Sequence, residues 1–183
     1  MTSKQTLDIV VSFHEDLINQ QNFADTENYY HIDKIYQILS KTLTYLDNHT
    51  EIIIPNLQRD WLKKSLELDI YVTKPVEARA INLEARGKDY ATNILSYPSD
   101  LPSNIAEMIP SLPLGELIIC HDVVAKQADE QQKTVEQHLT HLLVHGVLHL
   151  LGFDHELGQA EQDEMESIEI SVLNTLGVAN PYE

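Results

Sequence analysis

Cysteine is nearly absent from this chain of 183 residues, in which Cys120 stands alone. One thiol excludes an internal disulfide and any zinc site built from several thiolates, and we expect Cys120 to be a buried apolar filler. No apolar run approaches the roughly 18 residues that would span a membrane. The first residues also lack the apolar core and cleavage site of a signal peptide. These absences predict a cytoplasmic protein without a membrane partner.

Basic residues are also scarce, with 12 Lys and Arg against 29 Asp and Glu and a formal net charge of −17. Affinity for RNA normally depends on Lys and Arg contacts to phosphate. We therefore do not expect this chain to bind RNA strongly by itself. We expect a protein partner that delivers the substrate. The clustering of the basic residues predicts a locally positive groove; the alternative is an evenly solvated surface. Seven of the twelve lie between positions 59 and 88: Arg59, Lys63, Lys64, Lys74, Arg79, Arg86 and Lys88.

Length and composition suit a single domain over residues 1–183, with 43% hydrophobic and 22% charged residues. The hydrophobic pattern predicts an α+β fold: a small mixed β-sheet of about four strands, flanking helices, and one buried central helix. Residues 16–30 and 98–113 are predicted to be loops, and the second holds four of the seven prolines. The expected strands are 7–13, 66–73, 92–97 and 116–121, and the expected helices are 31–46, a short one after Pro55, 75–86, 133–151 and 159–177.

Three histidines near the end of the predicted helix 133–151 carry the clearest chemical signal. His145 and His149 are four residues apart, so they share one helical face. Gly152 can adopt the left-handed conformation that ends a helix and turns the chain, which would bring His155 to the same point. Three neutral imidazoles with a fourth position open are typical of a catalytic zinc site. The pattern H-x3-H-x2-G-x2-H therefore predicts a metal site that does chemistry.

An earlier histidine pair offers a competing ligand set. His138, His141, His145 and His149 form one stripe of the helix, so His141 and His145 are also four residues apart. Single histidines on apolar helices are usually core or rim residues. We favour the later pair because only that pair precedes the glycine turn, and we expect His138 and His141 to lie at the rim or behind the ligands.

The metzincin proteases share this histidine spacing but place a glutamate after the first histidine as the general base. Here that position is Gly146, which cannot move a proton. A peptidase would therefore need a carboxylate from elsewhere, such as Asp154 or Glu116. The missing base favours a hydrolase of a different class.

Residues 145–155 resemble the H-G-x-L-H-L-x-G-[YF]-D-H signature of the YbeY family of bacterial metal-dependent endoribonucleases. With the acidic C-terminal helix, the similarity covers residues 67 to 177. The departures are Tyr97, where phenylalanine is usual, and a longer N-terminal third, which leaves residues 14–60 without a role from the resemblance. Two further blocks fit the family, residues 82–98 (NLEARGKDYATNILSYP) and 114–120 (LGELIIC).

The resemblance implies a zinc-dependent endoribonuclease that is specific for single-stranded RNA and acts in 3′-end maturation of 16S ribosomal RNA and in ribosome quality control. It implies one zinc ion per chain, held by His145, His149 and His155, and a functionally important arginine at Arg86. The expected partners are ribosomal RNA and the small ribosomal subunit or its proteins, with no DNA. Residues 178–183 would be a tail.

We predict Arg86 and His145 as catalytic residues, with the guanidinium of Arg86 holding phosphate through its fork of donors. The structural alternative for Arg86 is a surface salt bridge. Zinc lowers the pKa of a bound water from about 15.7 towards 7, and either that water or the 2′-hydroxyl of the RNA could be the nucleophile. Two other functions stay open: a metal hydrolase of another class, such as an amidase or peptidase, and a ribosome assembly factor with a structural metal.

Several polar residues near these motifs have two possible roles. Asp154 could orient a ligand imidazole or cap the next turn, and Ser96 could bond near the site or satisfy backbone at a strand end. The acids of the last helix are predicted to face solvent: Glu161, Asp163, Glu164, Glu166 and Glu169.

Overall fold

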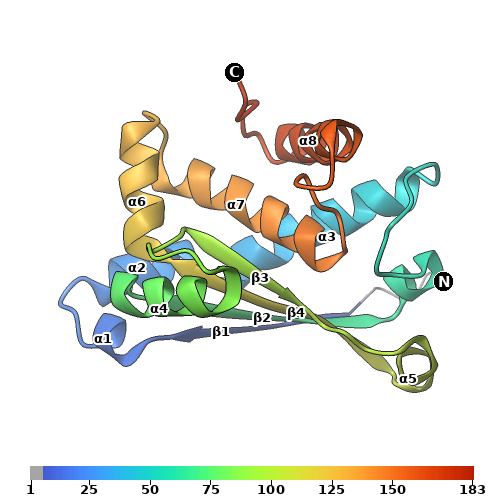
Figure 1. Cartoon of the computed structure of the whole chain (residues 1–183), viewed down its shortest axis with the longest axis horizontal. Helices are drawn as coiled ribbons and strands as arrows, with labels where there is room; N and C mark the ends of the chain where they lie inside the picture. The colour runs from blue at the N-terminus through green and yellow to red at the C-terminus, as the bar shows by residue number, and fades with distance from the viewer. Residues whose placement is uncertain (1–5) are drawn as a thin grey trace.

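A four-stranded β-sheet forms the base of the structure, a computed structural model that describes residues 6–183 (Figure 1). The strands are β1 (Leu7–Phe13), β2 (Ser65–Thr73), β3 (Ile94–Pro98) and β4 (Ser111–Cys120). Their order across the sheet is β1-β2-β4-β3. β1, β2 and β4 run parallel, and β3 runs antiparallel to β4. The predicted mixed sheet of four strands is confirmed.

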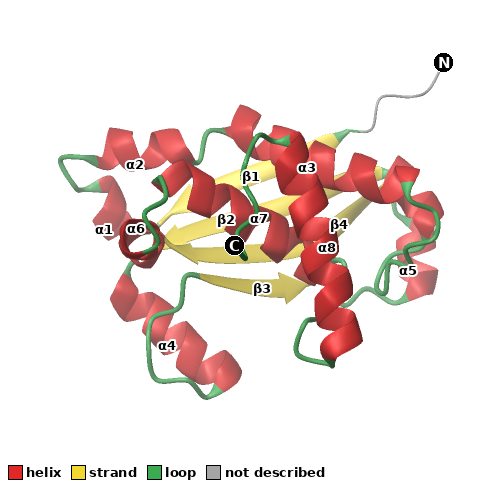
Figure 2. Cartoon of the chain, turned by 90° about the horizontal axis from the view of Figure 1, so that it is seen from above, coloured by secondary structure: helices red, strands yellow, loops and turns green. Residues whose placement is uncertain are grey.

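Helices cover one face of this sheet (Figures 1 and 2). α3 (Ile32–Asn48) and α7 (Val135–Leu150) lie over the strands, and α8 (Gln159–Thr175) lies farther from the sheet above them. α6 (His121–Glu130) stands at one end, and α4 (Pro75–Arg86) lies beside the β3 edge. The predicted α+β class is thereby confirmed. Within residues 6–183, no helix has both the length and the apolar character needed to cross a lipid bilayer.

Alternation along β2 explains why the sheet has one buried face. Side chains two residues apart point the same way along a strand, and Leu66, Leu68, Ile70 and Val72 are each at most 1% exposed. The strand predicted over 66–73 and the helix predicted over 31–46 both contribute side chains to this core. The apolar stripe of α3 contributes Ile35, Ile38, Leu39, Leu43 and Leu46.

Helix α7 is the buried central helix that the sequence predicted. A capping box starts it: Thr134 Oγ1 accepts a hydrogen bond from Gln137 N, and Gln137 Oε1 accepts one from Thr134 N. Of its 16 residues, 9 are buried. At Gly146, a β-carbon would lie 2.8 Å from both Ile94 Cδ1 and Leu117 Cδ2. The missing side chain therefore lets the helix backbone lie close to β3 and β4.

Residues 16–30 are not the loop that was predicted, because they form most of α1 (Glu15–Ile18) and α2 (Phe23–Tyr29). Phe23 and Tyr30 pack edge-on against Phe13 of β1, with ring centroids 5.1 and 5.9 Å from that of Phe13. Helices this short gain their stability from tertiary packing rather than from their own periodicity. The local pattern therefore gave no sign of them.

Residues 98–113 are also not an exposed loop, because they contain α5 (Ser103–Met108) and the start of β4, which begins at Ser111 rather than at 116. Pro113 is compatible with β4 because β3 pairs only with Gly115–Ile119, which leaves Pro113 beside β2 alone. The C-terminal end of α5 is capped by the side chain of Lys64, which is distant in the sequence. Lys64 Nζ donates to the carbonyl oxygens of Ala106, Glu107 and Ile109 at 2.9, 3.2 and 3.3 Å.

The strand predicted over 116–121 ends one residue early, and His121 begins α6, a helix that was not predicted. His121 is 9% exposed, and its Nδ1 lies 3.0 Å from the hydroxyl of Tyr30. This contact ties the start of α6 to the end of α2. Cys120 is 1% exposed, which confirms that it is a buried filler.

Replacing Gly146 by alanine tests the close contact between α7 and the sheet. Alanine stabilises a helix interior by about 1 kcal/mol relative to glycine, but overpacking a filled core costs about 1–3 kcal/mol. Ile94 and Leu117 are buried, so the two effects together should lower the free energy of unfolding of Gly146→Ala by up to about 2 kcal/mol. Urea denaturation measures this change. A more stable variant would show that the sheet accommodates the methyl group and would contradict the constraint.

Candidate metal centre

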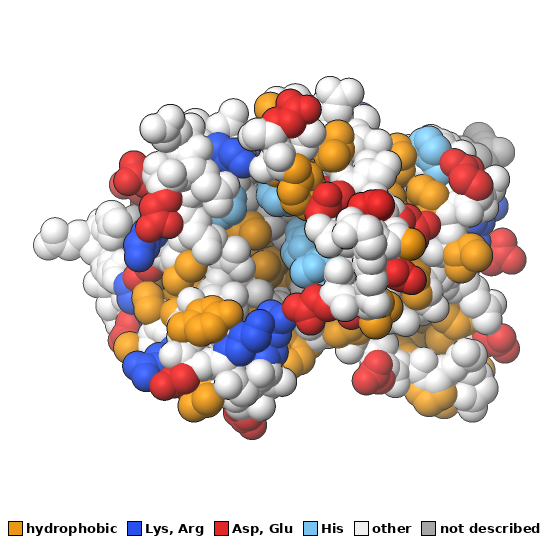
Figure 3. Space-filling model, turned by 45° about the horizontal axis from the view of Figure 1, so that its top comes forward, with side chains coloured by type: hydrophobic (Ala, Val, Ile, Leu, Met, Phe, Trp, Pro, Cys, Tyr) orange, Lys and Arg blue, Asp and Glu red, His pale blue; other side chains and the backbone are white. Residues whose placement is uncertain are grey.

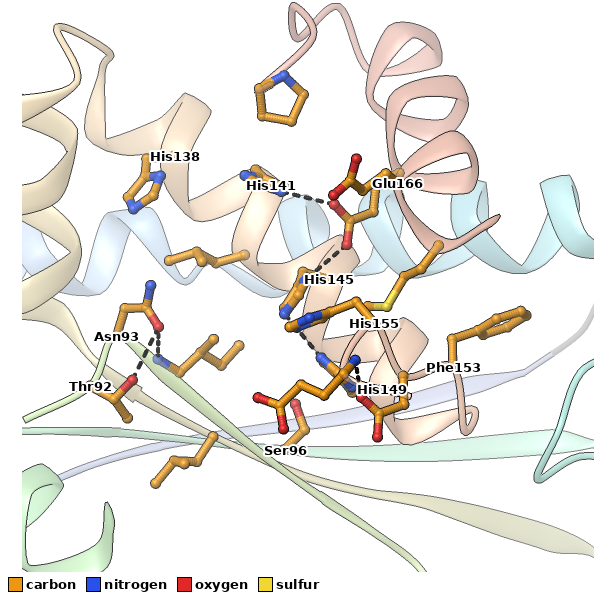
Figure 4. A pocket seen from close by; sticks show the side chains of 18 of the residues that line it. Thr92, Asn93, Ser96, His138, His141, His145, His149, Phe153, His155 and Glu166 are labelled. Carbon is orange, nitrogen blue, oxygen red and sulfur yellow. Dashed lines mark hydrogen bonds and ion pairs between the residues drawn. The ribbon is translucent and has the colours of Figure 1, made fainter. Parts of the chain in front are cut away.

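His145 and His149 lie one turn apart on α7, and a turn after the helix brings His155 beside them (Figure 4). Gly152 in that turn has a φ of 95°, and its N–H donates to His149 O at 3.0 Å. The next residue, Phe153, is 4% exposed and anchors the turn in the core. The structure thus brings together the three histidines selected from the sequence, by way of the predicted glycine turn.

The three imidazoles are close enough to share one ion. Nε2 of His145 is 3.0 Å from Nε2 of His149, and the ring centroid of His155 is 5.2 Å from each of theirs. One nitrogen from each ring lies within 4.8 Å of the other two. Two nitrogens that bind zinc tetrahedrally at about 2.0–2.1 Å stand about 3.3 Å apart. The donor types and their spacing therefore fit a zinc ion.

Burial, followed by the neighbouring imidazoles of His145 and His155, lowers the pKa of His149 to about 4. The ring is therefore neutral at physiological pH and keeps a lone pair. Neutral imidazole is the form that binds a metal. Burial, together with the crowding of the three rings, thus disfavours protonation of His149 and favours the ligand form.

Glu169 of α8 lies directly behind His145, so the prediction that it faces solvent is wrong. The residue is 0% exposed. His145 Nδ1 donates to its Oε1 at 2.7 Å, His141 Nε2 donates to its Oε2 at 3.0 Å, and the Tyr182 hydroxyl donates to Oε2 as well. Burial raises the pKa of Glu169, but the hydrogen bonds from His141, His145 and Tyr182 together outweigh it and lower the pKa to about 2.

The sequence held a signal for this burial. Glu169 comes four residues after Met165 and three before Val172, both of which are buried, so it occupies the apolar stripe of α8. A glutamate in such a stripe needs a buried partner. Of the other acids on this helix, Glu166 is half-buried, and the three exposed ones are as predicted: Glu161, Asp163 and Glu164.

His138 and His141 lie beside and behind the three converging histidines. His141, His145 and Glu169 form a second group whose possible ligand atoms lie within 4.8 Å of one another. His138 is 4% exposed, and its Nε2 lies 3.1 Å from Gln127 Oε1 and donates to it. The histidine stripe therefore contributes to two groups that share His145. One group, with His149 and His155, lines the cleft, and the other, with His141, is hydrogen-bonded to Glu169 of α8.

A cleft of about 1020 Å³ opens above the histidines, with walls from α7, α8 and β3 (Figure 4). Figure 3 shows histidine side chains inside this hollow, Lys and Arg on its left side and Asp and Glu on its right. A cleft of this volume is at the upper end of ordinary ligand sites. Its lining comes from distant parts of the chain, including Asn56, Arg86, Asn93, Gln127, Lys133 and Tyr182.

Arg86, at the end of α4, lines this cleft. Its Nη2 donates to Glu156 Oε1 at 2.8 Å, and Glu156 directly follows His155. The salt bridge considered as the structural alternative therefore exists, and it holds the guanidinium beside the loop that carries the third histidine. With 38% of the side chain exposed, Arg86 keeps donors accessible to a ligand in the cleft.

The basic cluster at 59–88 does not form the single positive groove that was predicted. Lys74 pairs with Asp122 at 2.8 Å, and Arg79 pairs with Asp89 at 2.7 Å. Arg59 and Lys64 are used to close the ends of α3 and α5. The cleft itself has an acidic lining, with the basic residues Arg86 and Lys133 against Asp154, Glu156, Glu166, Glu169 and Glu183.

Position 146 has no room for the glutamate of a metzincin, because Ile94 and Leu117 occupy the space of its side chain. Glu116 is no substitute, since it is adjacent to Leu117 on β4 and points to the opposite face of the sheet. On that face it pairs in register with Asp69, and burial, followed by this charge, raises the pKa of Glu116. Of the two stand-ins considered from the sequence, only Asp154 lines the cleft.

Asp154 and Ser96 both have local structural partners. Asp154 Oδ1 accepts a hydrogen bond from Glu156 N at 2.8 Å, so it caps the turn after the helix. Ser96 Oγ donates to Gly146 O at 3.4 Å. Each residue therefore has the backbone role that was its structural alternative, although both also line the cleft.

Known bacterial proteins are similar to this chain over most of its length. A protein of Psychrobacter cryohalolentis named Endoribonuclease YbeY is 58% identical over 151 residues, which cover 79% of this chain and 97% of that protein. One of the same name from Acinetobacter baumannii is 47% identical over 133 residues, 73% of this chain and 84% of that protein. A solution structure from Thermotoga maritima aligns with 92% of this chain and 91% of its own, at 18% identity and a TM-score of 0.48.

The sequence profile described as Endoribonuclease YbeY matches residues 22–177. The match includes Arg86, the three converging histidines and most of the segment 14–60, to which the motif resemblance gave no role. Together with the two bacterial relatives, it shows that the chain belongs to the Endoribonuclease YbeY family.

Proposed function

We propose that this chain is a zinc-dependent endoribonuclease that cleaves single-stranded RNA, with His145, His149 and His155 as the ligands of one zinc ion. The observation that carries the proposal is the meeting of three imidazoles in an open cleft, in a member of an endoribonuclease family. Structural zinc sites are usually closed by four protein ligands. Here three histidines meet at the cleft, which gives a substrate access to the ion.

His145 and Arg86 are the proposed catalytic residues. When bound, zinc lowers the pKa of a water ligand towards about 7 and stabilises charge on a phosphoryl oxygen. The guanidinium of Arg86 can hold two oxygens of the scissile phosphate through parallel N–H donors. Its bond to Glu156 keeps it beside the loop of His155, so phosphate binding and metal binding occur at the same end of the cleft.

Ribosomal RNA at the 3′ end of the 16S molecule is the proposed substrate, with the small ribosomal subunit or its proteins as partners in the cytoplasm. The acidic lining of the cleft supports the need for a partner, since RNA phosphates are held mainly by Lys and Arg. We propose residues 1–183 as one metallohydrolase domain, because Asn56, Arg86 and Tyr182 all line the same cleft.

Removing the metal should abolish cleavage of a labelled, unstructured RNA. We expect one zinc ion per chain in the wild type, loss of cleavage on chelation, and recovery when zinc is added back. His149→Ala should lose both zinc and cleavage, because two remaining ligands hold the ion poorly. Metal content and RNA cleavage are measured on the same preparations.

Equal cleavage by wild type and His149→Ala would reveal a contaminating ribonuclease and contradict the proposal. Zinc-loaded protein that spares RNA but hydrolyses amide bonds would point to an amidase or peptidase. Normal ribosome maturation in cells that carry a folded, zinc-free His149→Ala variant would favour an assembly factor in which the metal is not catalytic.

Replacing Arg86 should weaken catalysis without removing zinc. A hydrogen bond to a charged group contributes about 1.5–3 kcal/mol, so we expect kcat/KM of Arg86→Ala to fall by about 10- to 100-fold. Arg79→Ala is the matched control, since Arg79 lies on the same helix, pairs with Asp89 and does not line the cleft. Equal losses in the two variants would rule out a specific role for Arg86.

A further inference from the structure

Glu169 is a charged group in a place where charge is costly. Its carboxylate is 0% exposed, and an isolated buried carboxylate is strongly unfavourable. Across residues 6–183, no lysine or arginine forms an ion pair with it; its partners are His141, His145 and Tyr182. A buried carboxylate supported only by imidazoles and a phenol suggests a role in the adjoining site.

The hydrogen bond to Glu169 determines which nitrogen of His145 carries the proton. The carboxylate can only accept, so Nδ1 of His145 must be the donor across the 2.7 Å contact. Nε2 is then left with its lone pair, and this is the atom that lies 3.0 Å from Nε2 of His149. Glu169 therefore turns the free lone pair of His145 towards the other two histidines.

Tyr182, close to the C-terminal end of the described chain, holds the carboxylate from the other side. Its hydroxyl donates to Oε2 of Glu169, and its ring packs edge-on against that of His141 at 5.7 Å. The preceding residue is tied to the turn before α7 by a hydrogen bond from Lys133 Nζ to Pro181 O at 3.4 Å. Residues 181–183 also line the cleft. The segment predicted to be a tail is therefore part of the site.

We propose that Glu169 is a positioning residue, which is held by Tyr182 and His141 and keeps His145 protonated at Nδ1 with Nε2 directed at the metal. A carboxylate behind a ligand histidine fixes its tautomer and raises its basicity as a ligand. The inference rests on the proposed metal site. It adds a source of metal affinity outside the three ligands, and it assigns a role to the C-terminal tyrosine.

Zinc affinity of Glu169→Gln, measured by competition with a chromophoric chelator, tests the proposal. Glutamine keeps the size of the side chain and removes its charge, so we expect zinc to bind about 10- to 100-fold more weakly. Glu166→Gln is the matched control, because it removes a half-buried charge on the same helix at the same cleft. Zinc affinity of the control should change by less than about threefold. Melting temperatures of the metal-free proteins show whether each variant folds.

Tyr182→Phe removes one hydroxyl and should weaken zinc binding by less than Glu169→Gln does. Because Tyr182 acts through Glu169, its effect should vanish in the double variant. Additive losses would show that the tyrosine contributes independently and would contradict the proposed chain of contacts.

Equal zinc affinity of wild type and Glu169→Gln would overturn the inference while leaving the zinc site intact, whereas a wild type that binds no zinc would overturn the proposed function itself. If Glu166→Gln lost as much zinc affinity as Glu169→Gln, the effect would come from the net charge of the cleft and not from the position of Glu169. Two zinc ions per wild-type chain, with one lost in Glu169→Gln, would make Glu169 a ligand of a second ion instead.

Nitrogen-15 NMR of the histidines in wild-type protein gives a test that does not depend on the folding of any variant. We expect the His145 ring to carry its proton on Nδ1 both before and after zinc is added. A proton on Nε2 in the metal-free protein would mean that Glu169 does not set the tautomer.

Discussion

Helix α7 can carry this site only because its backbone lies close to the sheet at Gly146. Successive residues of an α-helix are about 100° apart around its axis. With Gly146 against the sheet, the histidines at 138, 141, 145 and 149 lie about 60–140° away around the helix. They therefore point sideways, into neither the sheet nor bulk solvent. A larger residue at 146 would collide with Ile94 and Leu117 unless these side chains or the helix moved.

That sideways position brings polar rings into a largely buried environment, and each ring needs a partner. Gln127 serves His138, Glu169 serves His141 and His145, and His149 meets His145. Burial and mutual repulsion hold His149 neutral. The same arrangement that is unfavourable for protonated imidazoles suits a cation, which could be bound by the ring nitrogens that lie close together here. The acidic lining of the cleft has the same consequence: it attracts a metal cation, but it repels the phosphates of RNA.

The regular elements could be read from the sequence where burial is periodic. The alternation of Leu66, Leu68, Ile70 and Val72 predicted β2, and the apolar stripe of residues 32–46 predicted α3, because each pattern reflects contact with a single core. The first two helices, α5 and α6 left no comparable pattern. They depend on contacts with distant residues, such as Phe23 with Phe13 and Lys64 with the end of α5. Such contacts exist only after the chain has folded.

The sequence by itself determined the three converging histidines and the turn that joins them, because spacing along a helix and a glycine at its end are local properties of the chain. It also determined the class of the fold and the family. Only the tertiary structure decided what surrounds the histidines: the burial of Glu169, the part played by Tyr182, the pairing of Arg86 with Glu156, and the dispersal of the basic cluster. These features depend on how α8 and the C-terminal segment pack against α7, and on the contact between the end of α4 and the loop after α7. The local sequence does not encode contacts between residues that lie far apart in the chain.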